Sequence, residues 1–211
     1  MRVKKCERGN KMKLVAIVGT NSKRSTNRKL LRFMAKHFAK QADIEILEIK
    51  DLPAFNEPED KIAPQAVASF TEKIVQAQGV IIATPEYDHT IPAPLSSALE
   101  WIAYTSRPLI NKPVMIVGAS LGLLGTSRAQ AHLRQILDAP ELKARLMPGN
   151  EFLLGHSEQV LTDEGELTNA DKVAELEDCF AEFLEFVSLT NQLVKEADTK
   201  RKQAFAWEAA D

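Results

Sequence analysis

Five short apolar segments recur along the chain at intervals that suit strands. Residues 12–19, 79–84 and 113–119 are almost continuously apolar and rich in Val and Ile, which is typical of strands buried on both faces of a parallel sheet. Residues 44–49 alternate between polar and apolar positions and predict another strand. A weaker apolar run at 151–154, after the turn residues Pro148 and Gly149, predicts the fifth.

Helical spacing fills the stretches between these segments. Apolar residues recur three and four positions apart between Leu30 and Phe38, and the same spacing predicts helices over 67–78, 94–104 and 129–137. Residues 166–211 contain neither Gly nor Pro, and we expect a long closing helix there. Strands that alternate with helices predict a doubly wound, parallel five-stranded α/β sheet with helices on both faces and right-handed crossovers.

Length and composition fit one folded domain with short appendages. We expect a basic appendage at 1–11, the domain at 12–190 and a helical tail at 191–211, whose Phe205 and Trp207 would pack against a protein surface. The net charge of −2 gives no reason to expect nucleic acid binding. No apolar run approaches the roughly 20 residues needed to cross a bilayer, and no signal peptide is visible, so we expect a cytoplasmic protein without membrane partners.

The cysteines and histidines do not indicate a metal site. Cys6 and Cys179 are the only cysteines and have no paired spacing, which argues against a disulfide framework and a zinc site. The four histidines lie far apart in the sequence, without the spacing of metal ligands.

Three polar loops follow the first, third and fourth strands, where doubly wound sheets bind ligands. The first, residues 19–27, offers hydroxyl groups, two cations and a helix N-terminus, which together favour a phosphate. In the second, residues 85–92, Tyr87 could stack on a planar ring. In the third, residues 119–126, glycines would let the backbone approach a flat ligand. The simpler alternatives are a helix cap at Ser25 or Thr26, a rigid proline-bracketed turn, and a glycine turn.

These loops carry a resemblance to a known family. Gly19-Thr20, Ser25 and Asn27, with Pro85-Glu86-Tyr87 and Ile91-Pro92, resemble the NADPH-dependent FMN reductase family of flavodoxin-like quinone, azo and chromate reductases. The resemblance covers about residues 12–189. It implies a flavodoxin-like fold and FMN as the cofactor. The implied cofactor-binding residues are Thr20, Ser22, Lys23, Ser25 and Asn27 around the phosphate, Pro85, Glu86, Tyr87 and Asp88 at the flavin ring, and Ser120, Leu121, Gly122 and Gly125 completing the pocket.

The chain departs from the family pattern in all three loops, and in the third it has Gly125-Thr126 in place of the usual glycine pair. The common arginine of the first loop falls at Ser22, so Lys23 or Arg24 is the candidate for the missing charge. The common asparagine after the tyrosine is replaced by Asp88.

The resemblance also implies an activity. Hydride would pass from NADPH or NADH through FMN to a small-molecule acceptor, such as a quinone, an azo compound or a free flavin, in a ping-pong cycle within a homodimer or homotetramer. We expect no catalytic side chain and interpret His89 as lining its loop, because a flavin exchanges its protons with water. Two alternatives stay open: a flavodoxin-type single-electron carrier, and a non-enzymatic flavin-sensing protein.

Overall fold

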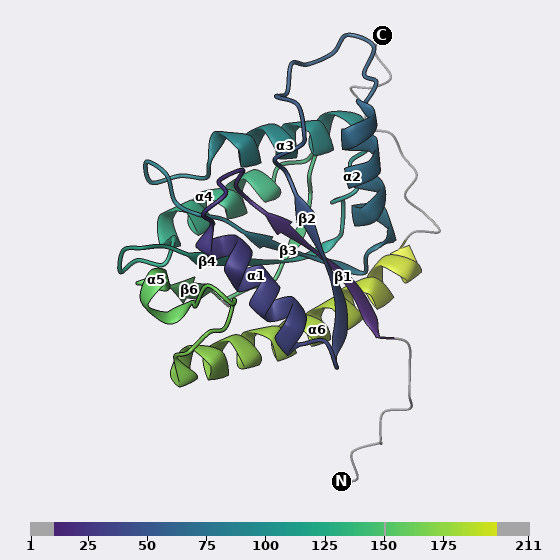
Figure 1. Ribbon diagram of the computed structural model, residues 1–211. Helices are drawn as coiled ribbons and strands as arrows, with labels where there is room; N and C mark the ends of the chain where they lie inside the picture. The colour runs from purple at the N-terminus through teal and green to yellow at the C-terminus, as the bar shows by residue number, and fades with distance from the viewer. Residues whose placement is uncertain (1–10, 150, 198–211) are drawn as a thin grey trace.

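The computed structural model describes residues 11–149 and 151–197 (Figure 1). The strands are β1 (Met12–Val18), β2 (Ala42–Glu48), β3 (Gly79–Ala83), β4 (Pro113–Ala119), β5 (Arg145–Leu146) and β6 (Phe152–Leu154). The helices are α1 (Thr26–His37), α2 (Gln65–Gln76), α3 (Ala93–Thr105), α4 (Ser127–Leu137), α5 (Ser157–Val160) and α6 (Ala170–Ala197).

The strands form one parallel sheet in the order β2-β1-β3-β4-β5, with β6 also paired to β4. This is the flavodoxin order, and it confirms the doubly wound fold expected from the sequence. Helices α1 and α6 cover one face of the sheet, and α2, α3 and α4 cover the other (Figure 1). From β1 the chain continues to β2 on one side of the sheet, and from β3 it continues to β4 on the other side. The strands are parallel, so the loops after β1 and β3 lie side by side at the carboxyl edge of the sheet.

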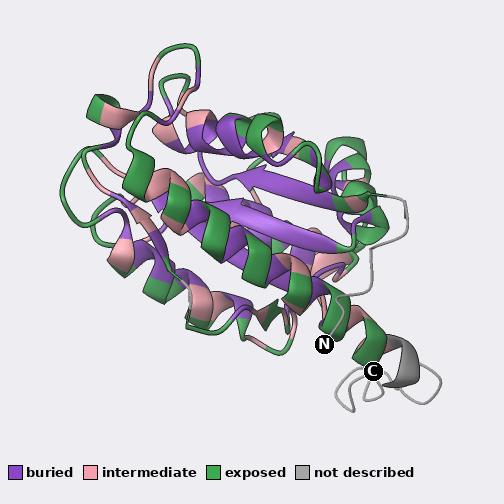
Figure 2. Ribbon diagram, turned by 90° about the horizontal axis from the view of Figure 1, so that it is seen from below, coloured by how far each residue is buried: buried purple, intermediate pink, exposed green. Residues whose placement is uncertain are grey.

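Two hydrophobic cores lie on the two faces of the sheet. Leu14 and Ala16 of β1 pack with the apolar side chains of α1 and α6, while Val15 and Ile17 face those of α2, α3 and α4. Figure 2 shows the strands buried between helices whose outer surfaces are exposed. The alternation explains the continuous apolar run of β1, because both faces of a central parallel strand are covered.

The edge of the sheet beside β4 differs from the expectation of one continuous fifth strand. β5 pairs with the start of β4 and β6 pairs with its end, so the strand is divided in two. Pro148 and Gly149 lie between the two parts; proline has no N–H to donate to a ladder, and Gly149 has a positive φ of 72°. The apolar pattern of the sequence predicted only the second part, β6, and it did not predict the short helix α5.

The closing helix is confirmed, and its inner face carries apolar residues. Leu176, Phe180 and Phe183 are fully buried, and the Phe180 ring stacks on Phe38 with 3.9 Å between centroids. α6 runs without a break across residue 191, where the tail was expected to begin. The appendage at 1–10 and the tail residues Phe205 and Trp207 lie outside the described residues. In the described ranges, no helix combines the length and the apolar character that crossing a bilayer requires.

Candidate functional site

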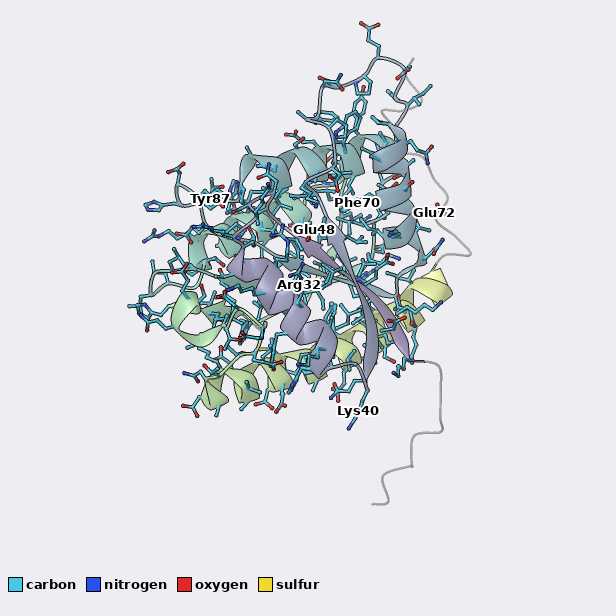
Figure 3. The ribbon with its side chains drawn as sticks, viewed as in Figure 1. Arg32, Lys40, Glu48, Phe70, Glu72 and Tyr87 are labelled. Carbon is cyan, nitrogen blue, oxygen red and sulfur yellow. The ribbon has the colours of Figure 1, made fainter. Side chains whose placement is uncertain are left out.

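A cleft of about 360 Å³ opens at the carboxyl edge of the sheet, where the loops after β1, β3 and β4 meet. This volume lies within the range of roughly 300–1,000 Å³ that is usual for small-molecule sites. Tyr87, one of the lining residues, is labelled in Figure 3. The lining residues are Thr20, Ser22, Arg24, Ser25, Thr26, Asn27, Pro85, Glu86, Tyr87, Ala119, Ser120, Leu121, Gly122 and Glu158.

The first loop presents the N-terminus of α1 to the cleft. Gly19 lets the start of this loop lie close to the end of β3, because a Cβ there would lie 2.6 Å from the carbonyl oxygen of Ala83. Ser25 is the N-cap, and its Oγ accepts a hydrogen bond of 3.1 Å from the backbone N–H of Arg28. Within the described residues, the backbone N–H groups of Thr26 and Asn27 have no acceptor. The capping interpretation of Ser25 is therefore correct, and its hydroxyl hydrogen is still able to donate to a ligand.

Asn27 joins the first loop to the end of β4. Its Nδ2 donates to the carbonyl oxygen of Ala119 at 2.8 Å, and its Oδ1 accepts from the N–H of Ala119 at 2.9 Å. The side chain is only 1% exposed. Asn27 lines the cleft, but its amide is engaged by the protein, so its backbone N–H is the group left for a phosphate.

The second loop is a tight hairpin turn that carries Tyr87. Tyr87 and Thr90 exchange two backbone hydrogen bonds, of 3.0 and 2.9 Å, and Asp88 and His89 at the tip both have positive φ angles. Asp88 and His89 are exposed at this tip. The Tyr87 hydroxyl lies 3.5 Å from Thr20 Oγ1, which brings the tyrosine across the mouth of the cleft to the first loop.

Two contacts fasten the second loop to α4. The Glu86 carboxylate accepts hydrogen bonds from the backbone N–H groups of Arg128 and Ala129, at 3.1 and 3.3 Å, and also pairs with the Arg128 guanidinium. It thus supplies the negative charge that a helix N-terminus favours. Thr90 Oγ1 is also hydrogen-bonded to His132 Nδ1. The Glu86 carboxylate therefore borders the cleft, but its oxygens already accept hydrogen bonds from α4.

The third loop contributes both polar and apolar groups. The Ser120 hydroxyl donates to the Gly122 carbonyl at 3.0 Å, while Leu121 is 61% exposed at the rim of the cleft. Gly125 serves packing instead: its φ is +56°, and a Cβ there would lie 2.7 Å from the carbonyl carbon of Leu153. The glycines of this loop therefore have different roles, since Gly122 lines the cleft and Gly125 packs against β6.

Most of the residues expected from the sequence meet at this one cleft. They are Thr20, Ser22, Ser25, Asn27, Pro85, Glu86, Tyr87, Ser120, Leu121 and Gly122. Three others do not line it: Lys23 and Asp88 are exposed outside it, and Gly125 is buried behind the third loop. Of the two cations considered for the first loop, Arg24 lines the cleft and Lys23 does not.

Three lining residues were absent from the expected set besides Arg24. Thr26 and Ala119 lie within the loop ranges 19–27 and 119–126, but neither was singled out there as a cofactor-binding residue. Glu158 belongs to the short helix α5, which the sequence pattern did not predict, and no sequence signal pointed to it.

Comparison with characterised proteins finds reductases. The chain is 57% identical over 201 residues to the NADH:(hydroxy)cinnamate reductase subunit CrdA of Vibrio ruber, covering 95% of this chain and all of the relative. It is 44% identical to the NADH-dependent flavin reductase subunit 2 of Lactobacillus johnsonii, over 83% of this chain and 97% of the relative. It is 35% identical to the quinone reductase of Escherichia coli, over 69% and 78% of the two chains.

The fold and the family agree with these relatives. The flavoenzyme FerB, an NAD(P)H:(acceptor) oxidoreductase from Paracoccus denitrificans, superimposes with a TM-score of 0.76 at 24% identity, covering 85% of this chain and 98% of FerB. The sequence model described as NADPH-dependent FMN reductase matches residues 12–159. This match confirms the expected enzyme class, an oxidoreductase that uses FMN and a nicotinamide nucleotide. The chain, with its flavodoxin-like sheet and its three-loop cleft, belongs to the NADPH-dependent FMN reductase family.

Proposed function

We propose that this protein transfers hydride from NADPH or NADH, by way of FMN bound in the cleft, to a small oxidised acceptor such as a quinone, an azo compound or a free flavin. The observation that carries the proposal is the composition of the cleft. Unpaired N–H groups at the start of α1 lie in the same cleft as Tyr87 and the open glycine loop. A phosphate at one end and a flat ring at the other match this arrangement.

The phosphate end of the cleft fits a single terminal phosphate. The N–H groups of Thr26 and Asn27 and the hydroxyl of Ser25 can donate to it, and the helix dipole favours the negative charge. Arg24, which lines the cleft two residues after Ser22, supplies a cation to the loop in which the family's arginine is replaced by Ser22. We therefore expect FMN to bind in preference to FAD, whose pyrophosphate this loop does not match.

The ring end of the cleft would orient a flavin and leave one side accessible. Pro85, Ser120 and Gly122 would border the ring, and Tyr87, which is 48% exposed, would lie at its edge. When bound, FMN supplies the hydride acceptor and the electron store for the reaction. The role of the chain is to position the ring so that the nicotinamide and the acceptor reach the open side in turn.

Anaerobic mixing tests this proposal directly. The holoprotein is mixed with NADPH or NADH while the flavin absorbance is followed. Bleaching within seconds is the expected result. Flavin that stays oxidised with both nucleotides would reject the reductase and favour the single-electron carrier. Double-reciprocal plots of the initial rate against NADH concentration, at several quinone concentrations, should then give parallel lines. Intersecting lines would reject a site that the two substrates share in turn.

A second candidate is the role of one subunit in a heteromeric reductase. The relatives from Vibrio ruber and Lactobacillus johnsonii are both named as subunits. Leu121, Leu123 and Leu124 beside the cleft are exposed, which suits contact with a partner chain. The purified chain alone distinguishes the two candidates: rapid flavin reduction by NADH without turnover on quinones would favour a subunit that passes electrons to another protein.

We also propose that the chain forms a homodimer or homotetramer and acts in the cytoplasm. The exposed leucines by the cleft support self-association, because exposed apolar clusters commonly mark interfaces. Light scattering on the purified protein gives the mass directly, and a monomer at micromolar concentration would contradict the oligomer.

A further inference from the structure

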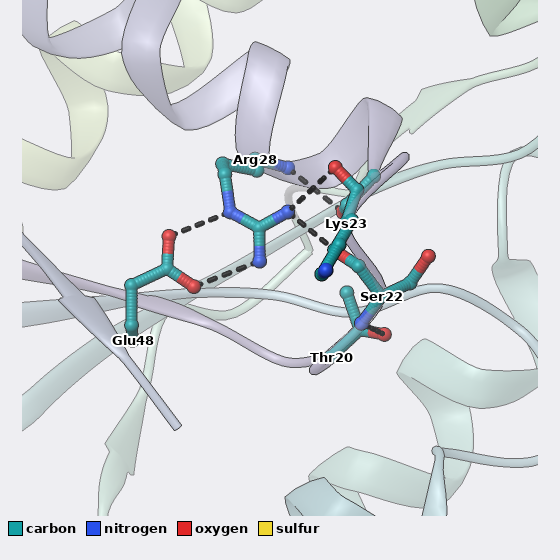
Figure 4. A network of polar contacts seen from close by, with 6 residues as sticks. Thr20, Ser22, Lys23, Arg28 and Glu48 are labelled. Carbon is teal, nitrogen blue, oxygen red and sulfur yellow. Dashed lines mark hydrogen bonds and ion pairs between the residues drawn. The ribbon is translucent and has the colours of Figure 1, made fainter. Parts of the chain in front are cut away.

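A partly buried ion pair lies behind the first loop, outside the lining of the cleft. Arg28 is the third residue of α1, and Glu48 is the last residue of β2. Arg28 Nε and Nη2 donate to the two oxygens of the Glu48 carboxylate at 2.6 and 2.8 Å, so the pair is bidentate (Figure 4). Arg28 is only 8% exposed, and Glu48 raises the pKa of the Arg28 guanidinium, so it stays charged.

The remaining terminal nitrogen of Arg28 holds the backbone of the first loop. Nη1 donates to the carbonyl oxygen of Ser22 at 2.6 Å and approaches the carbonyl oxygen of Lys23 at 3.4 Å (Figure 4). Two consecutive carbonyl groups of the loop therefore point to the same guanidinium. Glu48 fixes the guanidinium plane, and the guanidinium in turn fixes these two peptide groups.

The orientation of these carbonyls also determines the orientation of two N–H groups. In a trans peptide, the C=O of one residue and the N–H of the next point in opposite directions. Because the carbonyls of Ser22 and Lys23 face Arg28, the N–H groups of Lys23 and Arg24 face away from it. Ser22 and Arg24, on either side of Lys23, both line the cleft.

We propose that the Arg28–Glu48 pair is a positioning device for FMN binding, which holds the first loop so that its N–H groups and the Arg24 side chain are set for the phosphate. Arg28 would thus act through the loop backbone and not by touching the phosphate, since it is absent from the lining of the cleft. The inference rests on the proposed function, because it takes FMN as the ligand. The preference of the cleft for a phosphate would then depend in part on Glu48, which lies on β2 and outside all three loops.

The test compares FMN with riboflavin, which has the same ring and no phosphate. Affinities of the apoprotein are measured by quenching of flavin fluorescence for the wild type, Glu48→Gln and Glu45→Gln. Glu45 lies on the same strand and pairs with Lys73 on the surface, so Glu45→Gln makes the same change in net charge without touching the loop. We expect Glu48→Gln to weaken FMN about tenfold or more while riboflavin stays within about twofold, and Glu45→Gln to leave both unchanged.

Other outcomes reject the proposal in distinguishable ways. Equal weakening of FMN and riboflavin by Glu48→Gln, with a lowered melting temperature, would mean that the pair only stabilises the fold. Tighter or unchanged FMN binding would mean that Arg28, once released from Glu48, attracts the phosphate by its own charge or has no role. If the wild type binds neither flavin, the proposed function itself is rejected. If the wild type prefers FMN and Glu48→Gln keeps that preference, only the inference about the ion pair is rejected.

Arg28→Lys provides a second test that does not depend on Glu48→Gln being stable. Lysine keeps the positive charge but cannot bind a carboxylate in a bidentate manner while also holding two carbonyls. We expect this variant to lose the preference for FMN over riboflavin as well. Retention of the preference by a folded Arg28→Lys would show that charge alone suffices, and it would overturn the positioning role.

Discussion

Replacing Asn27 with alanine should destabilise the protein far more than a typical loss of one polar side chain. The Asn27 amide pairs with both the carbonyl and the N–H of Ala119, at 2.8 and 2.9 Å, in a position where both residues are 1% exposed. Alanine would leave both backbone groups without a partner, and each unpaired buried group costs about 1–3 kcal/mol. Water entering from the adjacent cleft would offset part of this cost, so we expect a loss of about 3 kcal/mol.

The measurement is thermal and urea unfolding of the apoprotein, so that ligand binding does not contribute to the stability. For a chain of this length, a loss of about 3 kcal/mol lowers the melting temperature by roughly 6–12 °C. Asn191→Ala is the matched control, because Asn191 makes a single exposed hydrogen bond of 2.9 Å to the carbonyl of Gln78. We expect this control to lose less than about 1 kcal/mol. Equal losses in the two variants would refute the reasoning that the buried clamp joins the first loop to β4.

Three further predictions concern the cofactor, the buried thiol and the third loop. The double change Ser22→Ala and Ser25→Ala should weaken FMN strongly, since each hydrogen bond to a charged group contributes about 1.5–3 kcal/mol, and unchanged affinity in a titration would contradict the phosphate assignment. Burial, with nearby carboxylates, raises the pKa of Cys179 from 9.0 to about 11. The unfolded thiol therefore loses its proton first, so stability should fall by up to about 2 kcal/mol as the pH rises from 9 to 11, an effect that Cys179→Ala should abolish in urea unfolding. Gly125→Ala should cost more stability than Gly149→Ala by thermal unfolding, because both glycines have positive φ but only Gly125 faces a backbone within 2.7 Å; equal losses would leave strain in φ as the sole cause.

The elements that the sequence predicted well are those whose local pattern and packing agree. β4 was expected over 113–119 and spans Pro113–Ala119, because a continuous apolar run bounded by Pro113 suits only a strand covered on both faces. α3 was expected over 94–104 and spans Ala93–Thr105, since its start is marked by prolines. The positions of the three loops followed from these elements, because parallel strands bring their carboxyl ends to one edge of the sheet.

The sequence alone determined most of the strands and helices and the three loops that meet at the cleft, because apolar period and turn residues are local properties of the chain. The individual lining residues followed from the family resemblance of these loops. Only the tertiary structure decided which loop residues face the cleft. It selected Arg24 over Lys23, assigned Gly125 to packing against β6, and divided the last strand at Pro148. Contacts such as Arg28–Glu48 and Asn27–Ala119 join residues 20 and 92 positions apart. No local pattern encodes such pairs, because they form only when the sheet has set the distance and direction between its loops.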